Sequence, residues 1–293
     1  MLIALGVMAF LKKTLYISDM DGTLLNRGGE LSPATLSGVN HMIREGGLFA
    51  LATARSPQSA QPLTSQLELN IPSVFINGVM LYDTAAQRPV EMTPVDVEVL
   101  PQLISIFEAH RSYGYMYAWD EGKISIFYNN LASLSARVYY EQRMRVYERR
   151  VYHSADYIQT ARENQILYLV MYGRHDVLQG AYEDIRRIPQ LNGTLYKDSY
   201  HDYYFIDIIS SSVSKATGMR RLKELCGADE MVAFGDNYND LFMLEAADRA
   251  YVPANGVQEA KEAADGVIGD CDMDGVVEFL LRDFHSKAGE FAV

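Results

Sequence analysis

Short apolar runs separated by helical patterns dominate both ends of the chain. The runs of strand length are residues 14–18, 48–52, 73–76, 231–234, 250–252 and 266–268. Between them, Ser32-Pro33 and Ser56-Pro57 each supply an N-cap and a first-turn proline, and further helices are expected at residues 215–226, after Tyr238 and at residues 257–264. Repeated strand–helix units predict a parallel sheet with helices on both faces, so the expected fold class is α/β with a doubly wound, Rossmann-like core.

The middle of the chain follows a different pattern. Aromatic residues alternate from Tyr113 to Trp119, a charged helical run covers residues 141–150, and residues 166–171 have the composition of a strand. Strands of one predicted sheet lie on either side of this interval. We therefore expect a smaller α/β cap domain at residues 84–206, inserted into a core formed by residues 1–83 and 207–293.

Composition and charge exclude several classes of partner. The 293-residue chain has a formal net charge of −12, which disfavours long-range attraction to nucleic acid and to anionic membranes. Its two cysteines, Cys226 and Cys271, lack Cys-x-x-Cys spacing, so a cytoplasmic protein without disulfides is expected. Residues 1–11 are apolar but shorter than the ~20 residues of a membrane span, and we interpret them as an extension of the first strand or a frayed start.

Polar residues follow four of the predicted strands at the points where the strands end. They are Asp19 with Asp21, then Thr53, Asn77 and Asp236. Because open α/β sheets bind ligands beyond the carboxyl ends of their strands, these residues are candidates for one site. If strand geometry persists, the side chains of Asp19 and Asp21 project to the same side, and Gly22 permits a sharp turn after them.

Gathered carboxylates indicate a cation and a phosphoryl-transfer chemistry. Several negative charges at one point are unfavourable unless a cation neutralises them, and oxygen ligands without nearby His or Cys favour Mg²⁺. A phosphoryl group held there would meet Asp19 as a nucleophile, while Asp21 could protonate the leaving oxygen and deprotonate the attacking water. A calcium-binding loop is disfavoured because Leu24 and Leu25 stand where it needs polar residues.

The string from Asp19 to Leu24, Asp-Met-Asp-Gly-Thr-Leu, resembles the first motif of the haloacid dehalogenase superfamily. Thr53, Lys215 and the string Gly235 to Asp240 follow in the expected order, and together with the position of the insertion they most resemble the Cof-type branch of phosphatases. This resemblance implies that Asp19 is the nucleophile and a metal ligand, and that Asp21 is the acid/base with its backbone carbonyl on the metal. The remaining implied roles are phosphate binding by Thr53, Lys215 and Asn239, a metal ligand in Asp236, and a hinge into the cap at Asn77-Gly78.

Other candidate residues carry two interpretations. Lys215 precedes Ala216 where the family usually has Gly, which is a departure from the motif. Asp240 is either a supporting acid near the metal or a first-turn helix residue, and Arg55 either aids phosphate binding or lies on the surface. The run Arg143, Arg145, Arg149 and Arg150 is interleaved with acids, so we expect a solvated helix face. The aromatic stripe is expected to pack against cap helices, and the histidines show no metal spacing.

These observations predict a phosphomonoester hydrolase that uses Mg²⁺ and acts on small phosphorylated metabolites, with sugar phosphates preferred by resemblance. Closure of the cap would exclude water and select the substrate. The alternatives are a phosphomutase of the same fold and a phospholigand-binding module without turnover. Asp21 argues against the module, because a pure anion binder has no use for a second carboxylate facing its ligand.

Overall fold

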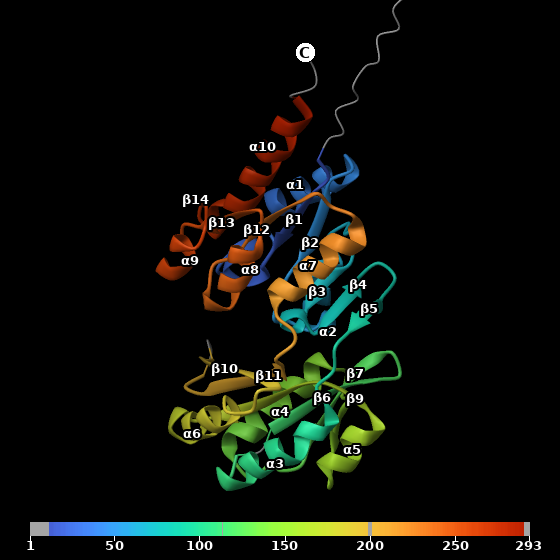
Figure 1. Ribbon diagram of the computed structural model, residues 1–293, viewed down its shortest axis with the longest axis vertical. Helices are drawn as coiled ribbons and strands as arrows, with labels where there is room; N and C mark the ends of the chain where they lie inside the picture. The colour runs from blue at the N-terminus through green and yellow to red at the C-terminus, as the bar shows by residue number, and fades with distance from the viewer. Residues whose placement is uncertain (1–11, 113, 199–200, 290–293) are drawn as a thin grey trace, which may run out of the picture. The chain divides into compact units, whose positions relative to one another are not determined.

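The computed structural model describes residues 12–112, 114–198 and 201–289 (Figure 1). The described chain separates into two compact units. One contains the described residues up to Thr53, residues 62–74 and those from Met219 onward, and the other contains residues 54–61 and 75–218. Residues 1–11 and Tyr113, for which the sequence predicted an extension of the first strand and the start of the aromatic stripe, lie outside the described residues.

A parallel sheet forms the centre of the first unit. Its strand order is β14-β13-β12-β1-β2, with all neighbouring pairs parallel. The bounds are β1 Thr14–Ser18, β2 Leu48–Leu51, β12 Glu230–Phe234, β13 Arg249–Pro253 and β14 Gly266–Ile268. A parallel bridge between Ala52 and Val74 links β2 to β3 (Ser73–Phe75). The predicted α/β fold class is confirmed, and every predicted core strand is present.

Helices lie on both faces of this sheet (Figure 1). They are α1 Pro33–Arg44, α2 Pro57–Thr64, α7 Lys215–Cys226, α8 Leu241–Ala246, α9 Gln258–Glu262 and α10 Gly275–Gly289. The start of α1 follows the predicted signature, because Ser32 Oγ accepts a hydrogen bond from the Thr35 N–H at 2.9 Å and Pro33 occupies the first turn. Strand β1 is buried along its whole length, as expected for a parallel strand covered on both faces.

The order of the strands creates a switch point between β1 and β12. From β1 the chain proceeds to β2 and then β3 on one side, whereas β12, β13 and β14 follow one another on the other side. At such a point the connections leave in opposite directions, and a crevice forms beyond the carboxyl ends of the two central strands. Any ligand of the sheet is therefore expected beside the ends of β1 and β12.

The second unit contains an antiparallel-rich sheet with the strand order β10-β11-β9-β6-β7-β8. Its strands are β6 Gly114–Asp120, β7 Lys123–Tyr128, β8 Val151–His153, β9 Gln165–Gly173, β10 Leu191–Lys197 and β11 Tyr204–Ser210, and a hairpin of β4 Met80–Asp83 and β5 Arg88–Met92 precedes them. Helices α3 Leu100–Ala109, α5 Tyr157–Glu163 and α6 His175–Ile185 bury an apolar core with one face of the sheet, which includes Met116 and Ala118.

The opposite face of the cap sheet carries the predicted aromatic stripe. Tyr115 and Tyr117 are buried there, and helix α4 (Leu134–Val146) packs over them. Tyr115 Oη donates a hydrogen bond to the carbonyl of Ala136 at 2.5 Å, and Tyr117 and Tyr139 share a hydroxyl hydrogen bond at 2.5 Å. The expectation that the stripe packs against a cap helix is confirmed for these residues.

The expectation of a solvated basic helix face is wrong for Arg143, and also for Arg150, which is partly buried with Nη2 2.6 Å from Asp120 Oδ2. Arg145 and Arg149 are exposed, and Arg149 lies beyond the end of α4. Arg143 instead is partly buried with its guanidinium carbon 4.8 Å from the centroid of the Tyr139 ring. The reason is that α4 lies on a sheet face, so one side of a helix that the charge pattern marks as polar is covered by tyrosines.

Candidate active site

Asp19 and Asp236 are placed by two neighbouring strands at the switch point. Strands β1 and β12 pair in parallel with Ser18 opposite Phe234, and the Asp19 N–H continues this ladder by donating to the Phe234 carbonyl at 2.9 Å. Asp236 follows the end of β12 by two residues. Both side chains therefore start from the carboxyl edge of the sheet, where the topology predicts a ligand.

Three carboxylates converge at this edge. Asp19, Asp236 and Asp240 each provide an oxygen, and these oxygens lie within 4.8 Å of one another. Asp19 is only 6% exposed and Asp240 is fully buried. Like charges at this separation and burial repel strongly unless a cation lies among them. Because all the donors are carboxylate oxygens, the set suits a hard ion such as Mg²⁺.

Gly22 and Thr23 fix the position of the Asp236 carboxylate. Gly22 has a φ of +79°, and a Cβ at this residue would lie 2.5 Å from Asp236 Oδ2. Thr23 Oγ1 donates a hydrogen bond to Asp236 Oδ1 at 2.8 Å. The expected sharp turn at Gly22 is present, and it has a second purpose because only a glycine allows this close approach of the backbone to Asp236.

Asp240 makes the contacts of a capping acid, which is one of the two roles that the sequence left open. Its Oδ2 accepts hydrogen bonds from the backbone N–H groups of Asp236 at 3.0 Å and Asn237 at 3.1 Å. It thereby caps the short 3₁₀ segment Tyr238–Asp240 and closes the loop that carries Asp236. It is also the third member of the carboxylate cluster. A charged acceptor that holds two N–H groups keeps the whole loop in one arrangement.

Asp21 is exposed, and its carboxylate is not one of the three clustered groups. Thr53 is buried two residues after the end of β2, and its N–H donates to the Val74 carbonyl at 2.9 Å. Asn239 is exposed within the Tyr238–Asp240 segment. Lys215 is the first residue of α7 and is 2% exposed, which is rare for a lysine and requires compensating partners.

Backbone strain marks the segment that leads from β3 into the second unit. Ile76, Asn77 and Gly78 all have a positive φ, at 52°, 51° and 100°. A β-branched residue in this region is an outlier that persists only where the surroundings fix it. A Cβ at Gly78 would collide with the backbone carbonyl of Ser214, and Arg55 fixes the same segment because its carbonyl accepts the Ile76 N–H at 3.0 Å.

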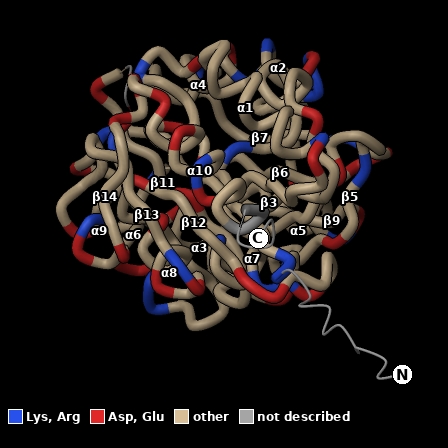
Figure 2. Tube along the Cα trace, turned by 90° about the horizontal axis from the view of Figure 1, so that it is seen from above, with Lys and Arg blue, Asp and Glu red and all other residues tan. Residues whose placement is uncertain are grey.

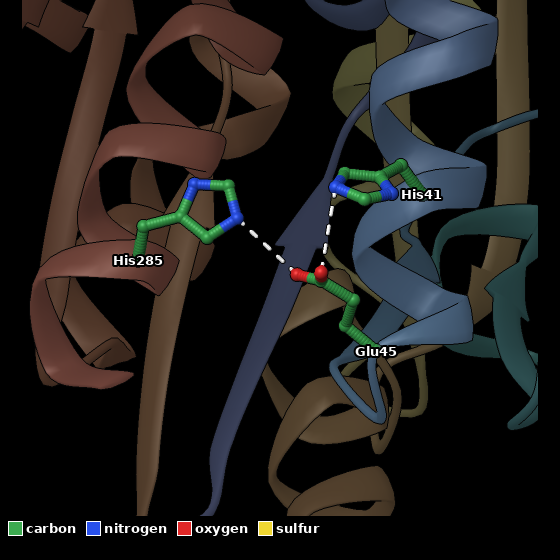
Figure 3. Close-up of side chains that lie close together, drawn as sticks. All are labelled: His41, Glu45 and His285. Carbon is green, nitrogen blue, oxygen red and sulfur yellow. Dashed lines mark hydrogen bonds and ion pairs between the residues drawn. The ribbon is translucent and has the colours of Figure 1, made fainter. Parts of the chain in front are cut away.

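The histidines show no metal-ligand spacing along the sequence, but the fold brings two of them together. His41, Glu45 and His285 gather where α1 ends near α10, with His285 Nε2 3.2 Å and His41 Nε2 3.5 Å from the two Glu45 oxygens (Figure 3). His41 lies on α1, and Glu45, four residues further on, directly follows the end of this helix. The sequence shows this spacing, but only the fold adds His285. All three side chains are exposed, and the cluster lies on helices rather than at the strand ends.

The fold and the site define a class of protein. A doubly wound parallel sheet with buried carboxylates at its switch point is typical of α/β proteins that bind an anion or a cation at the edge of the sheet. The sequence model of the haloacid dehalogenase-like hydrolases matches residues 16–280. The chain belongs to this family, and the Cof-type resemblance expected from the sequence is confirmed.

Two similar curated proteins are phosphatases. The pyridoxal phosphate phosphatase YbhA of Escherichia coli is 27% identical over 265 residues, which cover 89% of this chain and 95% of the relative. The 5-amino-6-(5-phospho-D-ribitylamino)uracil phosphatase YitU of Bacillus subtilis is 25% identical over 289 residues, which cover 93% and 98%. The crystal structure of a haloacid dehalogenase-like hydrolase from Bacteroides thetaiotaomicron superposes with a TM-score of 0.75 at 22% identity, over 93% of this chain and 100% of that one. The chain is accordingly an enzyme of the phosphatase class.

Two further features concern the described helices and the distribution of charged residues. None of the described helices combines the length and apolarity needed to cross a membrane. Lys and Arg positions are interspersed with Asp and Glu along the described trace (Figure 2).

Proposed function

We propose that this protein is a Mg²⁺-dependent phosphatase that hydrolyses small phosphorylated metabolites, preferably sugar phosphates, through an aspartyl-phosphate on Asp19. The observation that carries the proposal is the convergence of the Asp19, Asp236 and Asp240 carboxylates within 4.8 Å at the sheet's switch point. Three acids this close together, two of them buried, are not expected at a purely structural position, since each would repel the others. A nucleophile beside a cation site accounts for all three.

Asp19 and Asp236 would hold the ion through their carboxylates, together with the backbone carbonyl of Asp21. When bound, the ion supplies positive charge for the phosphoryl oxygens. An Asp19 oxygen attacks phosphorus in line, and the bond from phosphorus to the leaving oxygen breaks as Asp21 donates a proton to that oxygen. Asp21 then removes a proton from water, which attacks the phosphorus, and the Asp19 carboxylate is released with inorganic phosphate.

The remaining predicted residues bind the phosphoryl group. Thr53 and Asn239 would donate hydrogen bonds to its oxygens, and the Lys215 ammonium would balance the negative charge that the transferring group carries. Each such donor contributes to the rate when it is held in advance where the charge develops. The burial of Thr53 and Lys215 supports such fixed positions.

The relatives support a small phosphomonoester as substrate. YbhA is named for pyridoxal phosphate and YitU for a phosphoribitylaminouracil, and each of these is a single small molecule with one phosphate ester. The two named compounds differ greatly in the group that would leave when the phosphate ester is cleaved. A shared phosphoryl site with variable recognition of the leaving group is therefore the arrangement we propose for this chain.

The proposal is tested by a phosphatase screen on metal-stripped enzyme, over sugar phosphates, nucleotides and cofactor phosphates, with and without Mg²⁺. We expect turnover only with the divalent ion, and a loss of more than about a thousandfold in Asp19→Asn. Asp176→Asn, an exposed cap carboxylate paired with Arg174, is the matched control and should keep full activity.

Asp21→Asn tests the intermediate separately. Its slow second step should leave enzyme that carries one extra phosphoryl group in intact-protein mass spectra, and Asp19→Asn should not gain this mass. Turnover that persists in Asp19→Asn, or that ignores chelation of the metal, would refute the mechanism. Phosphate transfer between the positions of a sugar that requires a sugar bisphosphate would instead identify a mutase.

A further inference from the structure

Two histidines and a glutamate point toward one another on the surface of the first unit (Figure 3). His285 Nε2 lies 3.2 Å from Glu45 Oε2, and His41 Nε2 lies 3.5 Å from Glu45 Oε1. One ligand atom from each of the three residues lies within 4.8 Å of the other two. All three residues belong to the same compact unit, so the cluster is formed within that unit.

The packing of two helices sets the position of these side chains. Helices α1 and α10 approach closely at Gly38, where a Cβ would lie 3.1 Å from Leu281 Cδ1. His41 follows Gly38 by three residues, Glu45 follows His41 by four, and His285 follows Leu281 by four. Residues at these spacings share one face of a helix. The cluster therefore continues the interface between α1 and α10 at the point where it reaches solvent.

The cluster lies at the opposite edge of the sheet from the Asp19 carboxylate. Glu45 precedes Leu48, the first residue of β2, by three residues, whereas Asp19 directly follows the last residue of β1. Strands β1 and β2 are parallel, so Glu45 is at the amino edge of the sheet and Asp19 at its carboxyl edge. The proposed phosphatase chemistry uses none of the three clustered residues.

The donor set differs in kind from the all-oxygen cluster around Asp19. Two imidazole nitrogens and a carboxylate oxygen are ligands that Zn²⁺ takes in proteins, whereas Mg²⁺ prefers oxygen alone. In a tetrahedral zinc site with bonds of about 2.1 Å, neighbouring ligand atoms lie about 3.4 Å apart. The nitrogen-to-oxygen separations of 3.2 and 3.5 Å are close to this value. Three protein ligands leave a fourth position for water.

A cluster held by protons alone is the alternative arrangement. At these distances an imidazole that carries a proton on Nε2 pairs with one oxygen of Glu45. Zn²⁺ would take the place of two such protons and bring two positive charges to one point. The carboxylate favours a cation there, and so does the end of α1, because the C-termini of helices carry partial negative charge. Only the metal-bound arrangement makes the cluster respond to an added ion.

We propose that His41, Glu45 and His285 bind one Zn²⁺ ion, which links α10 to α1. This inference goes beyond the proposed phosphatase activity and does not depend on it. Glu45 and His285 are 240 residues apart in the chain, so only the folded protein presents the three ligands together. An ion that binds the folded chain in preference to the unfolded chain stabilises the fold. The expected effect of the ion is therefore a more stable first unit.

The experiment follows the histidine rings of the full-length protein by ¹H–¹⁵N NMR during a titration with zinc chloride, after bound metals have been removed by chelation. Excess Mg²⁺ is present throughout to occupy the Asp19 cluster, which in any case contains no histidine. The chain has six histidines. We expect the ring signals of two of them to shift and to reach their end point at one zinc ion per chain.

Single substitutions assign the site. His41→Gln and His285→Gln should each lack one of the two shifting signals. Each should also weaken zinc binding at least about tenfold, since loss of a group that only orients a metal ligand already costs about 10- to 100-fold. Glu45→Gln should keep both signals and weaken binding by a similar factor. His153→Gln, which removes an exposed histidine of β8, is the matched control and should bind zinc as the wild type does.

Urea unfolding followed by circular dichroism provides a second measurement. Zinc should raise the midpoint of the wild type and of His153→Gln but not that of His285→Gln. Without zinc the three proteins should unfold at nearly the same midpoint, because the replaced side chains are exposed. A zinc-dependent difference of this kind is not expected of a cluster held by protons alone.

Three outcomes would overturn the inference. The histidine signals could fail to respond to zinc, several histidines could respond in parallel without an end point, which would mark adventitious binding only, or His285→Gln could keep the zinc affinity of the wild type. Neither measurement uses catalysis. A failure of the proposed phosphatase activity and a failure of the zinc site are therefore told apart.

Discussion

Replacing Asp207 by Asn should change how the stability of the cap depends on pH. Burial raises the pKa of Asp207 to about 6, against the opposing effects of the Tyr196 hydroxyl and the Arg143 charge. Tyr139 on α4 also interacts electrostatically with this carboxyl group. From an ordinary value of 3.8, the difference of about 2 pKa units corresponds to about 3 kcal/mol.

The sign follows from which state binds the proton more tightly. Because the pKa is raised in the folded protein, protonation favours folding, and this stabilisation is fully present below about pH 4 and is lost as pH rises through about 6. Between pH 5 and pH 8 the wild-type protein should lose roughly 1.5 kcal/mol from this residue alone. Asn resembles the protonated acid and does not titrate, so Asp207→Asn should lack this loss and exceed the wild type in stability at pH 8.

Trp119 provides a local probe for this measurement. It is the only tryptophan of the chain and lies on β6 of the cap sheet, so its fluorescence reports unfolding of the cap. Urea unfolding of both proteins at pH 5, 6, 7 and 8 gives the difference in free energy, with Asp176→Asn as the exposed control. A difference that does not grow with pH, or a variant less stable than the wild type at pH 8, would contradict the raised pKa.

Three further changes test the site and the core. Gly22→Ala puts a Cβ 2.5 Å from Asp236 Oδ2 at a φ of +79°. We therefore expect at least about tenfold weaker activation in a Mg²⁺ titration and a free energy of unfolding lower by about 1–2 kcal/mol. Unchanged activation would refute the close approach. Asp240→Asn weakens two hydrogen bonds from backbone N–H groups, so it should lower the free energy of unfolding by about 1–3 kcal/mol and weaken Mg²⁺ activation. A loss of stability without weaker activation would show that Asp240 only caps the loop. Arg249→Met leaves Asp283, which is 13% exposed, without its cation. The free energy of unfolding measured in urea should fall by about 3–5 kcal/mol, whereas a change under about 1 kcal/mol would show that the pair is solvated.

The core could be predicted from the sequence because its signals are local. A parallel strand buried on both faces is a continuous apolar run. Strands β1 and β14 begin and end at the predicted residues, while β2 and β12 each differ by one residue at one end. The placement of Asp19 and Asp236 follows from the same reasoning, since parallel strands bring their carboxyl ends to one edge.

Other features of the site depend on turn geometry, which the pattern does not contain. The sequence left Asp240 between two roles. The structure shows the capping role, because the loop after β12 brings the Asp240 carboxylate to the N–H groups of Asp236 and Asn237. The positive φ of Ile76 could not be anticipated, because isoleucine disfavours that conformation and only its surroundings impose it.

Arg143 shows why a charge pattern fails where a helix crosses a sheet. The interleaved acids and bases around it are typical of a solvated face, and for Arg145 this interpretation is right. Residue 143 instead meets tyrosines from β6 and β9, strands that lie before and after α4 in the chain. The position of a side chain between non-local elements is set by tertiary packing, which local periodicity cannot encode. The carboxylates at the strand ends could thus be placed from local motifs, whereas the burial of Arg143 among tyrosines depends on the folded sheet.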